Sequence, residues 1–75
     1  MPNEIKKTYA YHKPSADGVA KIQQIRQAFS DFHAQLEGIL AGSRESSLVY
    51  TNLETAAMWA TKSVVLNDPG SEVLP

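Results

Sequence analysis

Two apolar stripes with helical spacing, joined by a very short link, constrain this chain more than any other feature of its sequence. The first stripe recurs at intervals of three and four and consists of Val19, Ile22, Ile25, Phe29, Phe32, Leu36 and Ile39. The second consists of Leu48, Val49, Leu53, Ala56, Ala60 and Val64. Such spacing is typical of helices that pack against other helices. Because so short a link allows only an antiparallel pair, the predicted fold class is all-α, a two-helix hairpin.

The first helix is expected at about 15–41. Ser15 or Asp17 can cap its N-terminus, since their side-chain oxygens accept hydrogen bonds from free backbone N–H groups. Gly42 is the expected stop, because glycine tolerates the left-handed conformation that often follows a last helical turn. The preceding residues, 1–14, contain two prolines and no helical period, so we expect them to form an N-terminal arm.

The second helix is expected at about 43–66. Ser43 is a good N-cap, and the sequence Asp68-Pro69-Gly70 is a strong turn and helix-breaking signal. The predicted organisation is therefore the arm, a helical hairpin over residues 15–67 and a tail over residues 68–75.

A lone hairpin of this sequence lacks enough core to be stable. A chain of 75 residues is small, and a domain of this size buries only about 60% of its unfolded surface. It has no cysteine, so disulfides are excluded, and its two histidines, His12 and His33, lack metal-ligand spacing. Met58, Trp59 and Val65 broaden the second stripe beyond one face. We therefore expect a homo-oligomeric helical bundle, with no metal site.

Charge and hydropathy exclude several classes of partner. The net charge is −1, which disfavours binding to long nucleic acids. No apolar run approaches the roughly 20 residues that span a membrane, and the N-terminus has no apolar core of a signal peptide. We therefore expect an intracellular protein without a membrane partner.

No catalytic motif is present, so we expect no catalytic residues, no enzyme activity and no cofactor. The sequence lacks a Ser-His-Asp order, a Gly-rich phosphate loop and a HExxH motif. His33 lies beside Phe32 in the first helix, and its simplest interpretation is a partly buried or interface histidine.

The arm interleaves aromatic and basic side chains in the stretch Lys6-Lys7-Thr8-Tyr9-Ala10-Tyr11-His12-Lys13. Aromatic rings stack on nucleobases and lysines pair with phosphates, so one interpretation is a nucleotide-binding arm. The alternative is a terminal segment whose tyrosines pack against a neighbouring subunit. Composition alone does not decide between these two interpretations of the arm.

A second polar cluster, Ser43-Arg44-Glu45-Ser46-Ser47, begins the second helix. It can cap that helix and form an Arg–Glu pair. It can also hold a phosphate with free amides, Arg44 and the hydroxyls. Arg26 lies away from the apolar seam of the first helix and can be exposed or reach a phosphate held by the arm.

Two stretches together resemble one known family. The arm motif Tyr11-His12-Lys13-Pro14 precedes Ile25-Arg26, and Ser43-Arg44-Glu45-Ser46-Ser47-Leu48 precedes Thr51-Asn52-Leu53-Glu54-Thr55-Ala56-Ala57-Met58-Trp59-Ala60. Both resemble signatures of the phage anti-CBASS cyclic-oligonucleotide sponges, whose helical-hairpin domain is shared with anti-Thoeris sponges. The resemblance runs from about Tyr9 to Asn67.

The resemblance implies a function and an assembly. Sponges of this family assemble, typically as hexamers, and sequester the cyclic nucleotide signals of CBASS immunity without cleaving them. Cyclic dinucleotides are the favoured ligands, and cyclic trinucleotides are a second class. The resemblance places the protein in the cytoplasm of the infected bacterial host. The alternatives are a structural or protein-interaction hairpin without a small ligand and, with less support, a cyclic-nucleotide hydrolase.

The resemblance also implies site residues. Tyr11 would stack on a base beside His12, and Arg26 would contact phosphate. The remaining expected ligand-binding residues are Lys13, Arg44 and Ser43. The sequence departs from the family near the end of the second helix, where some members carry an arginine that serves a trinucleotide site and this chain has Leu66-Asn67. Lys62 is the cation available nearby.

Overall fold

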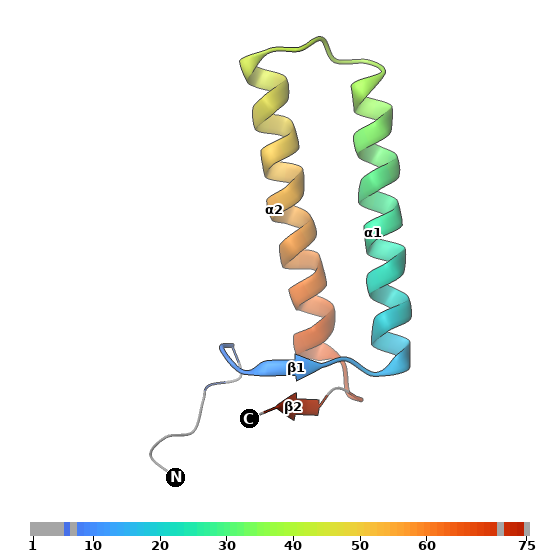
Figure 1. The fold of residues 1–75 in the computed structure, drawn as a ribbon, viewed down its shortest axis with the longest axis vertical. Helices are drawn as coiled ribbons and strands as arrows, with labels where there is room; N and C mark the ends of the chain where they lie inside the picture. The colour runs from blue at the N-terminus through green and yellow to red at the C-terminus, as the bar shows by residue number, and fades with distance from the viewer. Residues whose placement is uncertain (1–5, 7, 71, 75) are drawn as a thin grey trace.

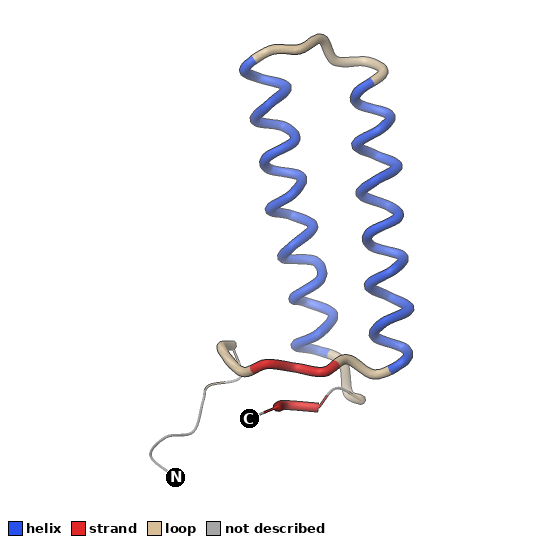
Figure 2. Tube along the Cα trace, in the orientation of Figure 1, coloured by secondary structure: helices blue, strands red, loops and turns tan. Residues whose placement is uncertain are grey.

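The computed structural model describes residues 6, 8–70 and 72–74. Its elements follow the order β1 (Tyr11–Lys13), α1 (Ala16–Glu37), α2 (Arg44–Asn67) and β2 (Glu72–Leu74). The helices stand side by side and antiparallel, and the strands lie at the end opposite the helix–helix loop (Figures 1 and 2). We call the end with the strands the base, and the end with loop 38–43 the tip. The predicted helical hairpin is confirmed.

α1 begins where the sequence predicts but ends earlier. Ser15 is its N-cap, and the Ser15 hydroxyl oxygen accepts a hydrogen bond from the Gly18 N–H at 3.1 Å. The helix ends at Glu37, whereas the sequence predicted an end near residue 41. The longer loop has a physical reason, because packed helix axes lie about 8–10 Å apart and a connection of one or two residues spans that distance poorly.

Gly38, and not Gly42, ends α1. Among the described residues no glycine has a positive φ, so the left-handed stop predicted at Gly42 is wrong. Gly38 has a right-handed φ of −77°, and its N–H lies within 3.3 Å of the Ala34 carbonyl oxygen and 3.2 Å of the Gln35 carbonyl oxygen. The low helix propensity of glycine favours an end of the helix here.

α2 has the predicted ends. The Ser43 hydroxyl accepts a hydrogen bond from the Ser46 N–H at 3.0 Å, and the Ser43 N–H donates to the Ser46 hydroxyl at 2.9 Å. This reciprocal arrangement is a capping box, with serine in the position that glutamate or glutamine usually takes. The helix ends at Asn67, directly before Asp68 and Pro69.

The described part of the single chain has an apolar seam rather than a buried core. Ile22, Ile25, Phe29, Leu36 and Leu53 are half-buried between the helices, and no hydrophobic side chain of the described residues is buried. The large exposed apolar residues are Tyr9, Val19, Phe32, Ile39, Leu40, Leu48, Val49, Met58 and Trp59. Neither helix has an apolar stretch of sufficient length to cross a bilayer.

The arm and the tail, which the sequence treated as separate segments, pair with each other. β1 and β2 form an antiparallel ladder in which Tyr11 is opposite Leu74, His12 opposite Val73 and Lys13 opposite Glu72. Three-residue strands are too short to show a period of two in the sequence. The ladder fixes the course of the arm across the end of α2 (Figure 1).

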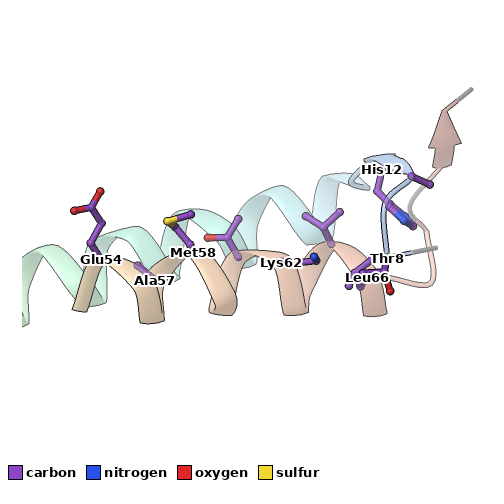
Figure 3. Close-up of a pocket in the computed structure, with 10 residues that line it drawn as sticks. Thr8, His12, Glu54, Ala57, Met58, Lys62 and Leu66 are labelled. Carbon is purple, nitrogen blue, oxygen red and sulfur yellow. The ribbon is translucent and has the colours of Figure 1, made fainter. Parts of the chain in front are cut away.

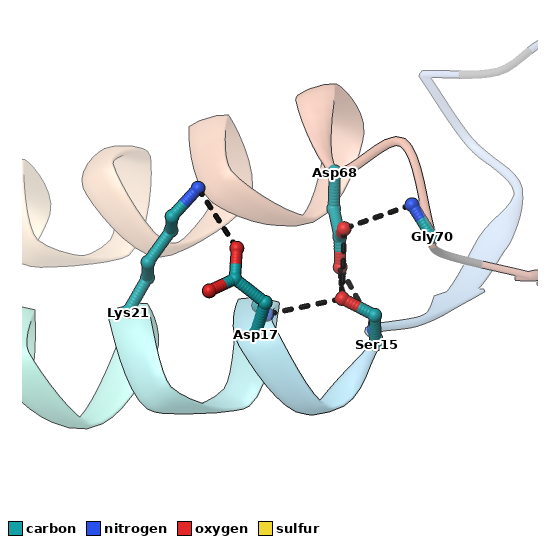
Figure 4. Close-up of polar contacts among 6 residues, drawn as sticks. Ser15, Asp17, Lys21, Asp68 and Gly70 are labelled. Carbon is teal, nitrogen blue, oxygen red and sulfur yellow. Dashed lines mark hydrogen bonds and ion pairs between the residues drawn. The ribbon is translucent and has the colours of Figure 1, made fainter.

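Asp68 fastens the same end of the hairpin. Its carboxylate accepts hydrogen bonds from the Ser15 N–H at 2.8 Å, the Ser15 hydroxyl at 2.8 Å and the Gly70 N–H at 3.0 Å (Figure 4). These bonds, first of all the one from the Ser15 backbone, hold the pKa of Asp68 below its ordinary value of 3.8. We call this group the Asp68 clamp. It joins the residue that follows α2 to the residue that precedes α1.

Candidate functional site

The candidate site is an open groove of about 540 Å³ between the arm and α2. Its lining residues are Thr8, Ala10, His12, Glu54, Ala57, Met58, Thr61, Lys62, Val65 and Leu66 (Figure 3). We call it the arm groove. Its volume falls within the roughly 300–1,000 Å³ that is common for small-molecule sites, and its lining is mostly apolar with a few polar groups, as in such sites.

His12 forms the arm side of the groove. It is 8% exposed, which makes it one of two buried polar residues in the described part of the chain. Its backbone is held in the β1–β2 ladder opposite Val73, and its ring points toward α2 (Figure 3). The pairing of β1 with β2 therefore positions His12 at the groove.

One face of α2 forms the other side. Glu54, Met58, Lys62 and Leu66 follow one another at intervals of four, so they lie along a single face of the helix. The Lys62 ammonium lies 5.5 Å from the centre of the Trp59 ring, a cation–π distance. The groove thus has a cation near the arm, a carboxylate farther along the helix and an apolar floor between them.

The structure brings only part of the predicted site to this groove. His12 lines it, whereas Lys13 is exposed on β1 and Arg26 is exposed on α1. Tyr11 belongs to β1, but its side chain lies outside the part of the chain that the structure describes. Within one chain, therefore, the groove is lined by residues of the arm and of α2, and Arg26 is not among them.

Ser43 and Arg44 lie at the tip, the opposite end of the hairpin from β1 (Figure 1). The Ser43 hydroxyl is engaged with Ser46 in the capping box. Arg44 is exposed, and the described residues provide no ion pair for it, so the Arg–Glu pair of the capping interpretation is not formed. A ligand in the arm groove would meet these two residues only from another copy of the chain.

Sequence reasoning missed most of the α2 side of the groove. It considered Lys62 only as the cation near a trinucleotide site, and it gave Glu54 and Met58 no role in ligand binding. The interval of four that joins these residues was a usable signal, because it places a carboxylate, a thioether and a cation on one helix face. What the sequence could not supply was the arm segment lying opposite that face.

A second cavity of about 460 Å³ lies between the helices nearer the tip. There the ring of His33 stacks on Tyr50 with centroids 4.3 Å apart, and its Nε2 lies 3.7 Å from a Glu37 carboxylate oxygen. His33 is half-buried, which agrees with its interpretation as a partly buried histidine. No group of three or more metal-ligating side chains occurs among the residues that the structure describes.

Comparison with known families gives one match. The model of the Acb2/Tad1 hairpin domain matches residues 1–65, which include the arm, α1 and nearly all of α2. No curated protein and no solved structure matches the chain. Leu66, Asp68 and β2 lie beyond the matched residues, so the family match covers the arm groove except Leu66 and does not cover the tail that pairs with the arm.

Proposed function

Because the chain belongs to the Acb2/Tad1 hairpin family of anti-CBASS and anti-Thoeris sponges, we propose that it sequesters cyclic dinucleotide signals of CBASS immunity without cleaving them. Cyclic trinucleotides are the second ligand class in this proposal. The protein would act in the cytoplasm of the infected bacterial host, where such signals are made.

The arm groove is the observation that carries the proposal. It places a buried imidazole, His12, and a lysine, Lys62, at the arm end of an apolar floor. Nucleotides need both a surface for the base and a cation for the phosphate. Tyr11 belongs to the same strand as His12, and the family resemblance assigns it the base-stacking role in this proposal.

Assembly is the second part of the proposal. Phe32 and Trp59 are 48% and 64% exposed, and the described residues include no buried hydrophobic side chain, so covering such residues in an assembly would add stability. A homo-oligomer also brings arm residues of one copy near Arg26 or Arg44 of another. We propose a hexamer, whose mass by light scattering would be six times the 8.2 kDa of one chain. A monomeric mass at working concentrations would contradict the assembly.

The proposal is tested by calorimetric titration of cyclic dinucleotides and trinucleotides into the assembled protein. Tyr11→Ala should weaken binding about tenfold or more, since stacking on one base contributes roughly 1–3 kcal/mol. Arg26→Ala should have a similar effect through a lost phosphate contact. Lys21→Ala is the matched control on the same helix, because Lys21 pairs with Asp17 and lies outside the arm groove.

The recovered ligand decides between sequestration and hydrolysis. Chromatography after prolonged incubation should return the cyclic form intact, and linear product would contradict a sponge. If a well-assembled oligomer binds no member of the panel, the exposed apolar residues favour the other candidate, a hairpin that binds protein partners.

A further inference from the structure

Glu54 is an unexpected residue in a groove for an anionic ligand. The described residues form no hydrogen bond or ion pair with its carboxylate, and it lines the arm groove on the same helix as Lys62. The two residues are separated by eight positions, or about 12 Å along the helix axis. A carboxylate repels phosphates, so this end of the groove suits a part of the ligand that presents hydrogen-bond donors.

We propose that Glu54 makes the groove selective for guanine-containing cyclic dinucleotides by accepting hydrogen bonds from the Watson–Crick edge of the base. This inference rests on the proposed function and adds the base preference. Guanine presents two adjacent donors, N1–H and N2–H, which match the two oxygens of a carboxylate. Adenine and cytosine each place an acceptor nitrogen beside their one amino donor, and that lone pair faces the carboxylate unfavourably.

The order of groups along α2 supports this orientation. Lys62 lies at the arm end, where His12 also lies, so the phosphates are expected there. Met58 and Ala57 separate Lys62 from Glu54 and provide an apolar surface for the face of the base (Figure 3). A nucleotide bound lengthwise therefore meets the cation with its phosphate and the carboxylate with its base edge. Charge-assisted hydrogen bonds of this kind are among the stronger polar contacts.

Phosphate binding by Lys62 can be followed through the fluorescence of Trp59. In the free chain its ammonium lies over Trp59, 5.5 Å from the ring centre. A phosphate that binds Lys62 would draw the ammonium away from the ring, so the fluorescence of Trp59, the single tryptophan of the chain, should change on binding. Lys62→Gln should weaken guanine and adenine ligands alike and leave their ratio unchanged.

The test compares cyclic di-GMP, cyclic GMP–AMP and cyclic di-AMP by calorimetry against the wild-type oligomer and Glu54→Gln. Wild-type protein should bind cyclic di-GMP about tenfold to a hundredfold more tightly than cyclic di-AMP, with the mixed ligand between them. Glu54→Gln should reduce this ratio to within about threefold, because an amide can donate as well as accept. Glu45→Gln is the matched control, since Glu45 is also exposed on α2 but lies at the tip.

The outcomes separate this inference from the proposed function. Equal affinities for the three ligands, or a guanine preference that survives in Glu54→Gln, would overturn the role of Glu54 while leaving the sponge intact. Absence of binding to every ligand would overturn both. Glu54 is exposed, so its replacement should not unfold the chain, and helical circular dichroism of each variant verifies this.

Discussion

The base and the tip of the hairpin are built on different principles. At the base, Asp68 bonds Ser15 across 53 positions of sequence, and β1 pairs with β2 across the whole hairpin. At the tip, the Ser43–Ser46 capping box spans three positions. The two buried polar residues in the described chain, His12 and Ser46, mark these two ends. One end is held by long-range contacts and the other by local ones.

The difference indicates where a ligand site can be built in a small chain. Local capping ends a helix but encloses no space, whereas the long-range contacts at the base place the arm opposite α2 and create the arm groove. We therefore expect changes at the base to affect stability and binding together. Changes at the tip should affect mainly stability unless neighbouring copies contribute tip residues to the site.

The largest effect is expected from alanine at Gly18. A Cβ there would overlap the Asp68 carboxylate and approach the Pro14 side chain to 3.2 Å. The Asp68 clamp must then open, and we expect Gly18→Ala to lower the free energy of unfolding by about 1–3 kcal/mol, as overpacking typically does. Denaturant unfolding measures the loss, and ligand affinity should fall with it.

Gly42→Ala is the matched change at the tip. A Cβ at Gly42 meets nothing within 4 Å, and its φ is not positive. The variant should be unchanged or about 0.4–1 kcal/mol more stable, because alanine restricts the unfolded chain. Equal destabilisation by both alanines would contradict the contrast between base and tip.

A smaller effect is expected when the capping box is broken. Ser43→Ala and Ser46→Ala each remove a reciprocal hydrogen bond and should each cost about 1 kcal/mol of stability. Ser43 is a predicted ligand residue and Ser46 is not, so affinity should fall only in Ser43→Ala. Titration of both variants measures this. Unchanged binding in Ser43→Ala would confine the site to the base.

The smallest expected effect is a loss of folding stability at acidic pH. The pKa of Asp68 is lowered on folding by the hydrogen bonds from Ser15, so its contribution is present above the unfolded value of 3.8 and is lost as pH falls through the lower folded value. The carboxylate is accessible to solvent, which limits this contribution.

Thermal unfolding from pH 7 down to below pH 4 should therefore show a steeper loss of stability in wild type than in Asp68→Asn, because the variant has no titratable carboxylate at position 68. Asp31→Asn, a replacement on the exposed side of α1 where the carboxylate accepts a bond from Gln27, is the control. Parallel curves for wild type and Asp68→Asn would show that the Asp68 clamp carries no charge-dependent stability.

Much of the fold followed from local sequence signals. The apolar stripes predicted the hairpin, Ser15 and Ser43 predicted its caps, and the turn signal at Asp68 predicted the end of α2. The prediction was wrong at Gly42, because α1 ends before Gly38 and a longer loop joins the two helices. Of the predicted site residues, His12 was placed at the groove, while the α2 face with Glu54 and Lys62 was not recognised.

The sequence by itself determined the helices and their caps, because helical periodicity and capping depend on residues within about four positions of one another. It also carried the motifs that identified the family. Only the tertiary structure decided that the arm pairs with the tail, that Asp68 joins Ser15, and that His12 lies opposite the Lys62 face of α2. Those contacts join segments separated by the whole hairpin, and no local pattern specifies which distant segments meet once the helices have folded against each other.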